Sequence, residues 1–241
     1  YPLRILMWHE IVNDEIAGVP VAVTFCPLCN AAMVFDRRLD GMVLDFGTTG
    51  KMRNSELVMS DRQPESWWQQ FTGEAIVGAL TGKRLRILPS RLESWAQFRE
   101  RAPDGAVLVP NDPEFRAYGI NPYIGYERQA RPYAFFTGPL PETVPALTRV
   151  VSLADRGEAW SFPLLRERGE IVTEDGTVLR WVPGQLSALD REMIVESMDV
   201  GTVTATRDGP DGIEDVAYFV DYAFAFHAFH PEAPIHHLGA P

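Results

Sequence analysis

Residues 19–37 read VPVAVTFCPLCNAAMVFDR and contain both cysteines of the chain, Cys26 and Cys29. The runs 19–25 and 32–37 on either side are rich in apolar and β-branched residues, which is typical of strands. The proline between the cysteines has no backbone N–H and limits continuation of the first strand. We therefore expect a strand, a tight Cys-x-x-Cys turn at the rim of a site, and a second strand.

Further hairpins are expected along the chain. Asp40-Gly41 lies between two more apolar runs, and Asp-Gly in that setting is a strong hairpin signal. The same signal recurs at Asp208-Gly209 and Asp211-Gly212. The segment 111–141 is dense in proline and glycine, so we expect an irregular loop that forms a lid or a wall. The prediction is a mainly β fold, α+β at the margin, built as a hairpin-rich sheet or a barrel-like domain.

One helix is predicted, from Leu92 to Arg101. The sequence from Ser90 to Glu93 has the capping-box pattern, and apolar residues recur at helical spacing through Trp95 and Phe98. We expect this aromatic stripe to pack in the core.

The whole chain, 1–241, is interpreted as a single domain with a weak internal repeat. The matching strings are YPL followed by EIV at 1–3 and 10–12, and FPL followed by EIV at 162–164 and 170–172. These strings predict two degenerate repeats, 1–82 and 160–230, joined by the helix and loop region 83–159. Chance similarity of such short strings is the alternative.

The composition is that of a globular domain with an acidic surface. Of 241 residues, 46% are hydrophobic, and 22 basic against 33 acidic residues leave a formal charge of -11. Such a surface repels phosphate backbones and anionic lipids, so nucleic acid is excluded as a partner. The chain has no apolar stretch of the roughly 20 residues that span a bilayer. Because Tyr1 is not an initiator methionine, we expect upstream sequence to have been removed, and membrane contact only through an N-terminal anchor there.

Two cysteines in a Cys-x-x-Cys turn are suited to holding one soft metal ion. Thiolates select copper or zinc over magnesium and calcium, and a zinc site needs three or four protein ligands. The missing ligands must come from the five histidines. His9 lies between apolar residues, and His230 ends the pair His227-x-x-His230. The metal ligands predicted are Cys26, Cys29, His9 and His230.

The spacing of the histidine pair matters for that prediction. Residues 216–229 are apolar on nearly both sides of a period-two pattern, so we favour a buried strand there. Residues three apart in a strand point to opposite faces, and we expect only one of His227 and His230 inside.

Thiol–disulfide chemistry is the alternative use of the two cysteines. A redox pair of this spacing is normally followed by a helix that lowers the thiol pKa, whereas here β-like residues resume after Asn30. Within this alternative, Cys29 is expected to have the better stabilised thiolate, because it precedes a turn with free amide donors. A third interpretation is a non-enzymatic binding or scaffold module in which a Cys26–Cys29 disulfide rigidifies the turn.

A second polar cluster lies downstream. Asn54, Asp61, Arg62 and Trp67 are interpreted either as structural residues, with Asp61 and Arg62 as an ion pair, or as the wall of a substrate-binding site. The candidate ligand is an unidentified small molecule or a metal ion.

Several strings together are similar to one prokaryotic family. They are WHEIVND at 8–14, FCPLC at 25–29, FDR at 35–37, NS-x-LVM-x-DR at 54–62 and, more weakly, AFHP at 228–231. The chain resembles the family catalogued as domain of unknown function 3179. Ser60 departs from the family pattern, which usually has Tyr at that position.

The resemblance implies motif roles and a location. The motif positions include His9, Glu10, Cys26, Cys29, Asp36, Arg37, Asn54, Asp61, Arg62 and His230. Many members of the family look exported, which implies a periplasmic or extracellular location. The leading hypothesis is a copper or zinc site with redox or hydrolytic chemistry, in which Cys26, Cys29 and Glu10 are the catalytic candidates. An enzyme and a metal carrier both remain open.

Overall fold

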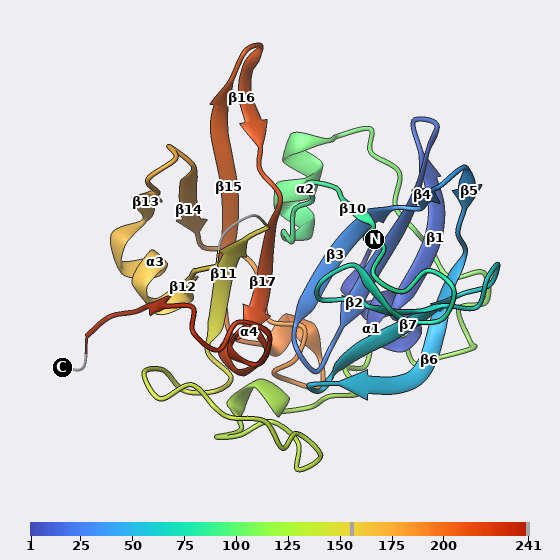
Figure 1. The fold of residues 1–241 in the computed structure, drawn as a ribbon. Helices are drawn as coiled ribbons and strands as arrows, with labels where there is room; N and C mark the ends of the chain where they lie inside the picture. The colour runs from blue at the N-terminus through green and yellow to red at the C-terminus, as the bar shows by residue number, and fades with distance from the viewer. Residues whose placement is uncertain (155–156, 240–241) are drawn as a thin grey trace.

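The computed structural model describes residues 1–154 and 157–239, and within them the fold is mainly β (Figure 1). Four four-stranded sheets are arranged like the blades of a four-bladed propeller, and a two-stranded hairpin and four short helices complete the described residues. Neighbouring strands are antiparallel except for one parallel pair, β12 (Ala159–Ser161) with β18 (Ile235–His236). The mainly β, hairpin-rich prediction is confirmed.

The first sheet carries the Cys-x-x-Cys turn. It has the order β1-β2-β3-β10, with β1 at Ile11–Ile16, β2 at Val19–Cys26, β3 at Ala31–Asp36 and β10 at Arg86–Ile87. Cys26 faces Ala31 across the β2–β3 ladder, so the turn is as tight as the sequence indicates. The expected strand–turn–strand unit is confirmed.

The next strands also form hairpins. At Asp40-Gly41 the chain turns between β4 (Arg38–Leu39) and β5 (Met42–Val43), and both turn residues have the positive φ that this hairpin type requires, 49° and 80°. The sheet that follows has the order β6-β7-β8-β9, at Phe46–Arg53, Glu56–Asp61, Trp67–Gln69 and Glu74–Val77.

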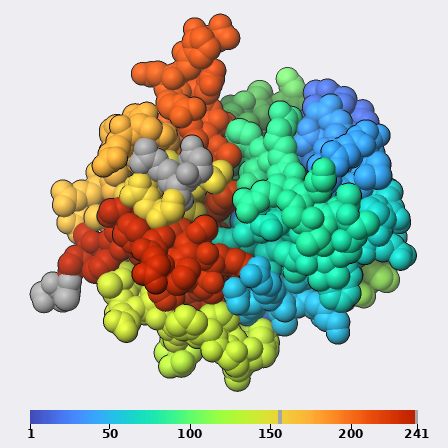
Figure 2. All heavy atoms as spheres, in the orientation of Figure 1, coloured from blue at the N-terminus to red at the C-terminus, as the bar shows by residue number. Residues whose placement is uncertain are grey.

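The C-terminal half supplies the other two sheets. One has the order β17-β11-β12-β18, with β11 at Arg149–Leu153 and β17 at Tyr218–Tyr222. The other is a meander, β13 (Glu170–Val172), β14 (Val178–Val182), β15 (Thr202–Gly209) and β16 (Gly212–Asp215). The β15–β16 hairpin, which the Asp-Gly signals predict, protrudes from the surface (Figure 2).

The helices are α1 (Leu3–His9), α2 (Trp95–Arg101), α3 (Phe162–Arg168) and α4 (Ala223–Phe229). None of the helices in the described ranges is long and apolar enough to cross a bilayer. The predicted helix exists as α2, but it begins at Trp95 because the working capping box is formed by Ser94 and Gln97. The expectation of a core aromatic stripe is wrong, since Trp95 is 58% exposed and no α2 residue is buried.

The strand predicted over 216–229 is also wrong in its second half. The chain leaves β17 at Tyr222 and continues as α4, whose residues Ala223 to Phe226 are buried. An apolar run that is buried on all sides has no polar face to reveal its period, so pattern alone does not separate a strand from a buried helix. Alanine, which favours helices, alternates with the aromatic residues in this run.

The segments that suggested a repeat have the same local fold. Both α1 and α3 are seven residues long, and each is followed by a residue with positive φ, Glu10 at 60° and Gly169 at 71°. In each case the N–H of that residue bonds to the carbonyl four residues earlier, and an antiparallel strand follows. A duplication of the two halves stays a prediction.

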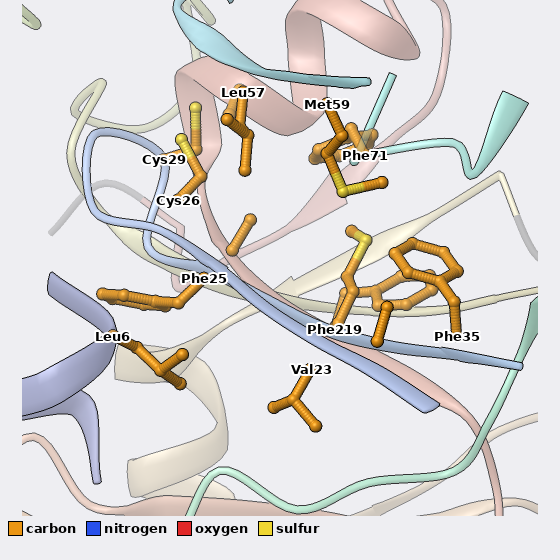
Figure 3. Packing of buried hydrophobic residues seen from close by; sticks show 14 of the residues in the cluster. Leu6, Val23, Phe25, Cys26, Cys29, Phe35, Leu57, Met59, Phe71 and Phe219 are labelled. Carbon is orange, nitrogen blue, oxygen red and sulfur yellow. The ribbon is translucent and has the colours of Figure 1, made fainter. Parts of the chain in front are cut away.

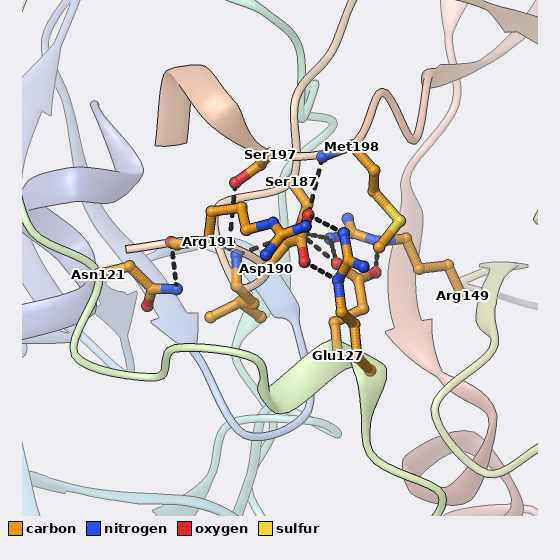
Figure 4. Close-up of polar contacts among 10 residues, drawn as sticks. Asn121, Glu127, Arg149, Ser187, Asp190, Arg191, Ser197 and Met198 are labelled. Carbon is orange, nitrogen blue, oxygen red and sulfur yellow. Dashed lines mark hydrogen bonds and ion pairs between the residues drawn. The ribbon is translucent and has the colours of Figure 1, made fainter. Parts of the chain in front are cut away.

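A buried ion-pair network holds the long irregular loop to the strands (Figure 4). The guanidinium of Arg149, in β11, donates to the Glu127 carboxylate and to Ser187, and both charged side chains are almost fully buried. Arg128 pairs with Asp190 in the adjoining segment. The loop predicted over 111–141 is confirmed as irregular, with one short 3-10 turn, Tyr126–Arg128, among its residues. The network fixes Tyr126 over the Cys-x-x-Cys turn.

Candidate functional site

Cys26 and Cys29 lie inside the molecule. Cys26 ends β2, Cys29 follows in the turn, and their exposed fractions are 2% and 0%. Both are free thiols, and their sulfur atoms lie side by side in Figure 3. The expectation that the turn forms a site rim is wrong, because three other segments cover it. The disulfide of the scaffold interpretation is not present.

Three hydrogen bonds clamp the turn from different directions. The Cys29 thiol donates to the carbonyl of Ser55 at 3.2 Å, at the β6–β7 turn. The N–H of Tyr222, at the end of β17, donates to the Cys29 carbonyl at 2.8 Å. The Tyr126 hydroxyl donates to the carbonyl of Leu28 at 2.9 Å. The thiols are therefore enclosed by elements from all parts of the sequence.

Two carboxyl groups share this interior, Glu56 in β7 and Asp221 in β17, and both are fully buried. One Glu56 oxygen accepts hydrogen bonds from the Gln69 amide and the Phe71 N–H, while the other has no partner among the described residues. Neither oxygen of Asp221 has one there. Sequence reasoning missed both residues. Asp221 is the single acidic residue in the apolar run 218–226, a signal that would have found it, whereas Glu56 follows the polar residues 53–55 and has no such signal.

The interior holds further polar atoms that lack partners within the described ranges. They are Asn30 Oδ1, Ser55 Oγ, Gln69 Oε1, Gln70 Oε1 and Tyr222 Oη. Buried polar atoms in folded proteins are normally hydrogen-bonded, so a concentration of unpaired ones marks a place for a bound group or for water.

Burial makes the acidic groups of this interior reluctant to ionise. The pKa of the Cys29 thiol is raised well above its usual range by burial first, then by contact with Cys26 and by the charges of Glu56 and Asp221. Burial also raises the pKa of Glu56 and of Asp221. Burial therefore acts against a thiolate at Cys29, and which of the two thiolates is better stabilised stays a prediction.

The two candidate histidines lie elsewhere. His9 shares a 2.7 Å hydrogen bond with the Tyr118 hydroxyl and stacks on the rings of Phe115 and Tyr118. His230 packs against Phe71 and Phe226, and burial lowers its pKa. His227 and His230 are both partly buried, so the expectation of one inside and one outside is wrong. Across 1–154 and 157–239, no three His, Cys, Asp or Glu side chains form a group that can hold a metal ion.

Glu10, the third catalytic candidate, lies between α1 and β1, and its backbone pairs with the residue before Cys26. Its carbonyl accepts a 2.8 Å hydrogen bond from the N–H of Phe25, next to Cys26. Its carboxyl group lines a hollow of about 510 Å³ beside α1, and burial raises its pKa. Glu10 therefore belongs to a neighbouring hollow rather than to the thiol interior.

The second predicted cluster is dispersed. The buried Asp61 carboxylate accepts hydrogen bonds from the N–H groups of Glu65 and Ser66 and from the Trp68 indole, at 2.8–3.1 Å. Arg62 points to solvent, so the Asp61–Arg62 ion pair is wrong. Asn54 donates to the Ala228 carbonyl at 3.3 Å, and Trp67 is partly exposed in β8. Asp61 organises the β7–β8 turn, and substrate binding by these four residues stays a prediction.

Alkylation tests the enclosure of the thiols. We expect both cysteines of the reduced, metal-free protein to react far more slowly than free cysteine near neutral pH, because both thiols are buried and the turn is covered. Tyr126→Ala removes the side chain that covers the turn. We expect this variant to raise the alkylation rates of both cysteines by more than about 10-fold through local opening. Mass-mapped alkylation with time measures the rates.

The control variant is Leu165→Ala. Leu165, in α3, belongs to a hydrophobic core cluster that contains neither cysteine. This variant lowers global stability by about 2–5 kcal/mol without uncovering the thiols. Equal acceleration in both variants would mean that global unfolding, and not the Tyr126 cover, controls access.

The buried carboxyl groups predict a pH-dependent stability. In the folded state Asp221 stays neutral above the pKa that it has when unfolded, so stability falls as pH rises, by about 1.4 kcal/mol per pH unit for each such group. We expect Asp221→Asn to flatten this slope between about pH 5 and pH 8 in urea unfolding of the metal-free protein. Asp211→Asn, at the exposed β15–β16 turn, should leave it unchanged. An unchanged slope in Asp221→Asn would show an ionised, compensated Asp221.

Comparison with known proteins agrees with the motif strings. Neither the curated proteins nor the solved structures contain a match to this chain. A family model with the description "Protein of unknown function (DUF3179)" matches residues 1–233, which is nearly the whole chain. The resemblance inferred from the motifs is confirmed, and the chain belongs to the DUF3179 family.

Proposed function

We propose that this protein binds a soft cation between the thiols of Cys26 and Cys29, with copper(I) favoured over zinc. The observation that carries the proposal is a pair of free, buried thiols that lie side by side in an interior where several other polar atoms lack partners among the described residues. Thiolates are the ligands that copper(I) prefers. Binding replaces the two thiol protons by one copper(I) ion and releases both protons.

The number of available ligands separates the two metals. Zinc sites in proteins use three or four protein ligands in tetrahedral geometry. The described residues offer no such group, because His9 and His230 lie apart from the thiols. Copper(I), a d10 ion, accepts linear coordination by two thiolates. The ligand set that we propose is therefore Cys26 and Cys29 alone.

Glu56 and Asp221 support this site by their position. A bis-thiolate copper(I) unit carries one negative charge, which is costly in a buried interior. Neutral carboxyl groups add no charge, and each can donate a hydrogen bond to a thiolate sulfur. These two residues are thus proposed to surround the ion without ligating it.

Thiol–disulfide exchange is the second candidate, because the two sulfur atoms lie side by side. It is less favoured. The attacking species is the thiolate, and burial raises the pKa of Cys29. The turn also leads directly into β3 and not into a helix. The proposal includes the location outside the cytoplasm that the family resemblance implies, and it covers a carrier as well as an enzyme.

Anaerobic copper(I) titration against a competing chelator tests the proposal. We expect one copper(I) per chain, and Cys26→Ser or Cys29→Ser should weaken binding by more than about 100-fold, because each removes a ligand. His9→Gln and His230→Gln are the matched controls and should bind as the wild type does. Binding that survives both serine variants, or that is lost in the histidine variants, would contradict the proposed ligand set.

A further inference from the structure

A hollow of about 510 Å³ lies between α1 and the irregular loop, outside the thiol interior. Its lining residues are Met7, Trp8, Glu10, Arg116, Pro122 and Tyr123. Small-molecule sites are typically about 300–1,000 Å³ in volume, and they combine apolar and aromatic walls with a few polar groups. This hollow has that make-up, and the copper proposal makes no use of it.

The hollow holds one acidic and one basic side chain that are not paired. Within the described ranges, neither Glu10 nor Arg116 has an ion-pair partner, and the two do not pair with each other. Arg116 lies over the Phe115 ring, 4.3 Å from its centroid, and donates to the Phe115 carbonyl at 3.2 Å. Its remaining N–H groups are free for an anion.

The walls are fixed in place by hydrogen bonds. The Glu10 N–H donates to the Leu6 carbonyl at 2.7 Å, and the Glu10 carbonyl accepts from the Phe25 N–H at 2.8 Å. The His9–Tyr118 hydrogen bond of 2.7 Å ties the loop that carries Arg116 to the end of α1. One hollow is therefore lined by an acidic residue at the end of α1 and by a basic residue of the loop.

We infer that this hollow binds a small zwitterion, an amino acid or a short peptide with free ends. The ligand's ammonium group faces Glu10, and its carboxylate faces Arg116, whose planar guanidinium suits bidentate carboxylate recognition. The rings of Trp8 and Tyr123 lie against its apolar part. A ligand with both charges pairs both side chains, whereas a ligand with one charge leaves the other unpaired.

Burial raises the pKa of Tyr123 to about 12, and Tyr123 lines the hollow together with Glu10. The inference stands on the hollow alone and does not require copper, since no thiol lines it.

Isothermal titration calorimetry of the copper-free protein tests the inference with phenylalanine and Gly-Phe as probes. N-acetyl-Gly-Phe lacks the ammonium group, and Gly-Phe amide lacks the carboxylate. We expect a free-ended probe to bind and each capped form to bind more weakly by about 10-fold or more, as expected for loss of a charge-assisted contact.

Two variants test which side chain recognises the ammonium group of the ligand and which recognises its carboxylate. Glu10→Gln should abolish the preference for a free ammonium group only, and Arg116→Gln the preference for a free carboxylate only. Glu15→Gln in β1 and Arg131→Gln in the same loop change the charge in the same way at exposed positions; these two controls should bind as the wild type does. Thermal unfolding confirms that each variant is folded. Failure of both free-ended probes to bind, or equal binding of free and capped forms, would overturn the inference.

Discussion

The turn between β2 and β3 is buried, and the rest of the molecule is arranged to keep it so. Its carbonyl and thiol groups are bonded to Ser55, Tyr126 and Tyr222, from the second sheet, the long loop and the third sheet. A four-residue turn normally lies on the surface, because its backbone groups need partners. Here other segments supply those partners, and this requirement explains why the irregular loop is anchored by the buried Arg149–Glu127 pair.

This enclosure is energetically unfavourable taken alone. A buried polar atom without a partner costs about 1–3 kcal/mol, and the interior around the thiols holds several. Apolar residues of similar size would stabilise the fold better. This cost is one reason for the copper(I) site that we propose, which uses the two thiols as soft ligands among neutral carboxyl groups. Because Tyr126 covers the turn, the proposed loading requires local opening of the loop.

Those parts of the fold that depend on neighbours in sequence could be predicted. The strands around Cys26 and Cys29, the Asp40-Gly41 hairpin and the proline-rich loop all follow from local turn chemistry and residue type. The point where β17 ends could not be predicted, because the alternating alanine and aromatic residues of 223–229 fit a buried helix as well as a strand. Only part of the candidate site could be predicted. The cysteines are close in sequence, whereas Glu56 and Asp221 come near them only through the packing of strands that are distant in sequence. The sequence favoured histidines as the remaining metal ligands, but His9 packs against Tyr118 and His230 against Phe226.

The enclosed thiol turn and the acidic groups around it are neutral in the metal-free protein. Infrared spectroscopy at neutral pH measures their protonation, because the S–H stretch and the C=O stretch of a protonated carboxyl group lie apart from the bands of the ionised forms. We expect an S–H band that is lost in Cys29→Ser and protonated carboxyl bands that are lost in Glu56→Gln and Asp221→Asn. Absence of these bands in the wild type, with carboxylate and thiolate in their place, would contradict this expectation.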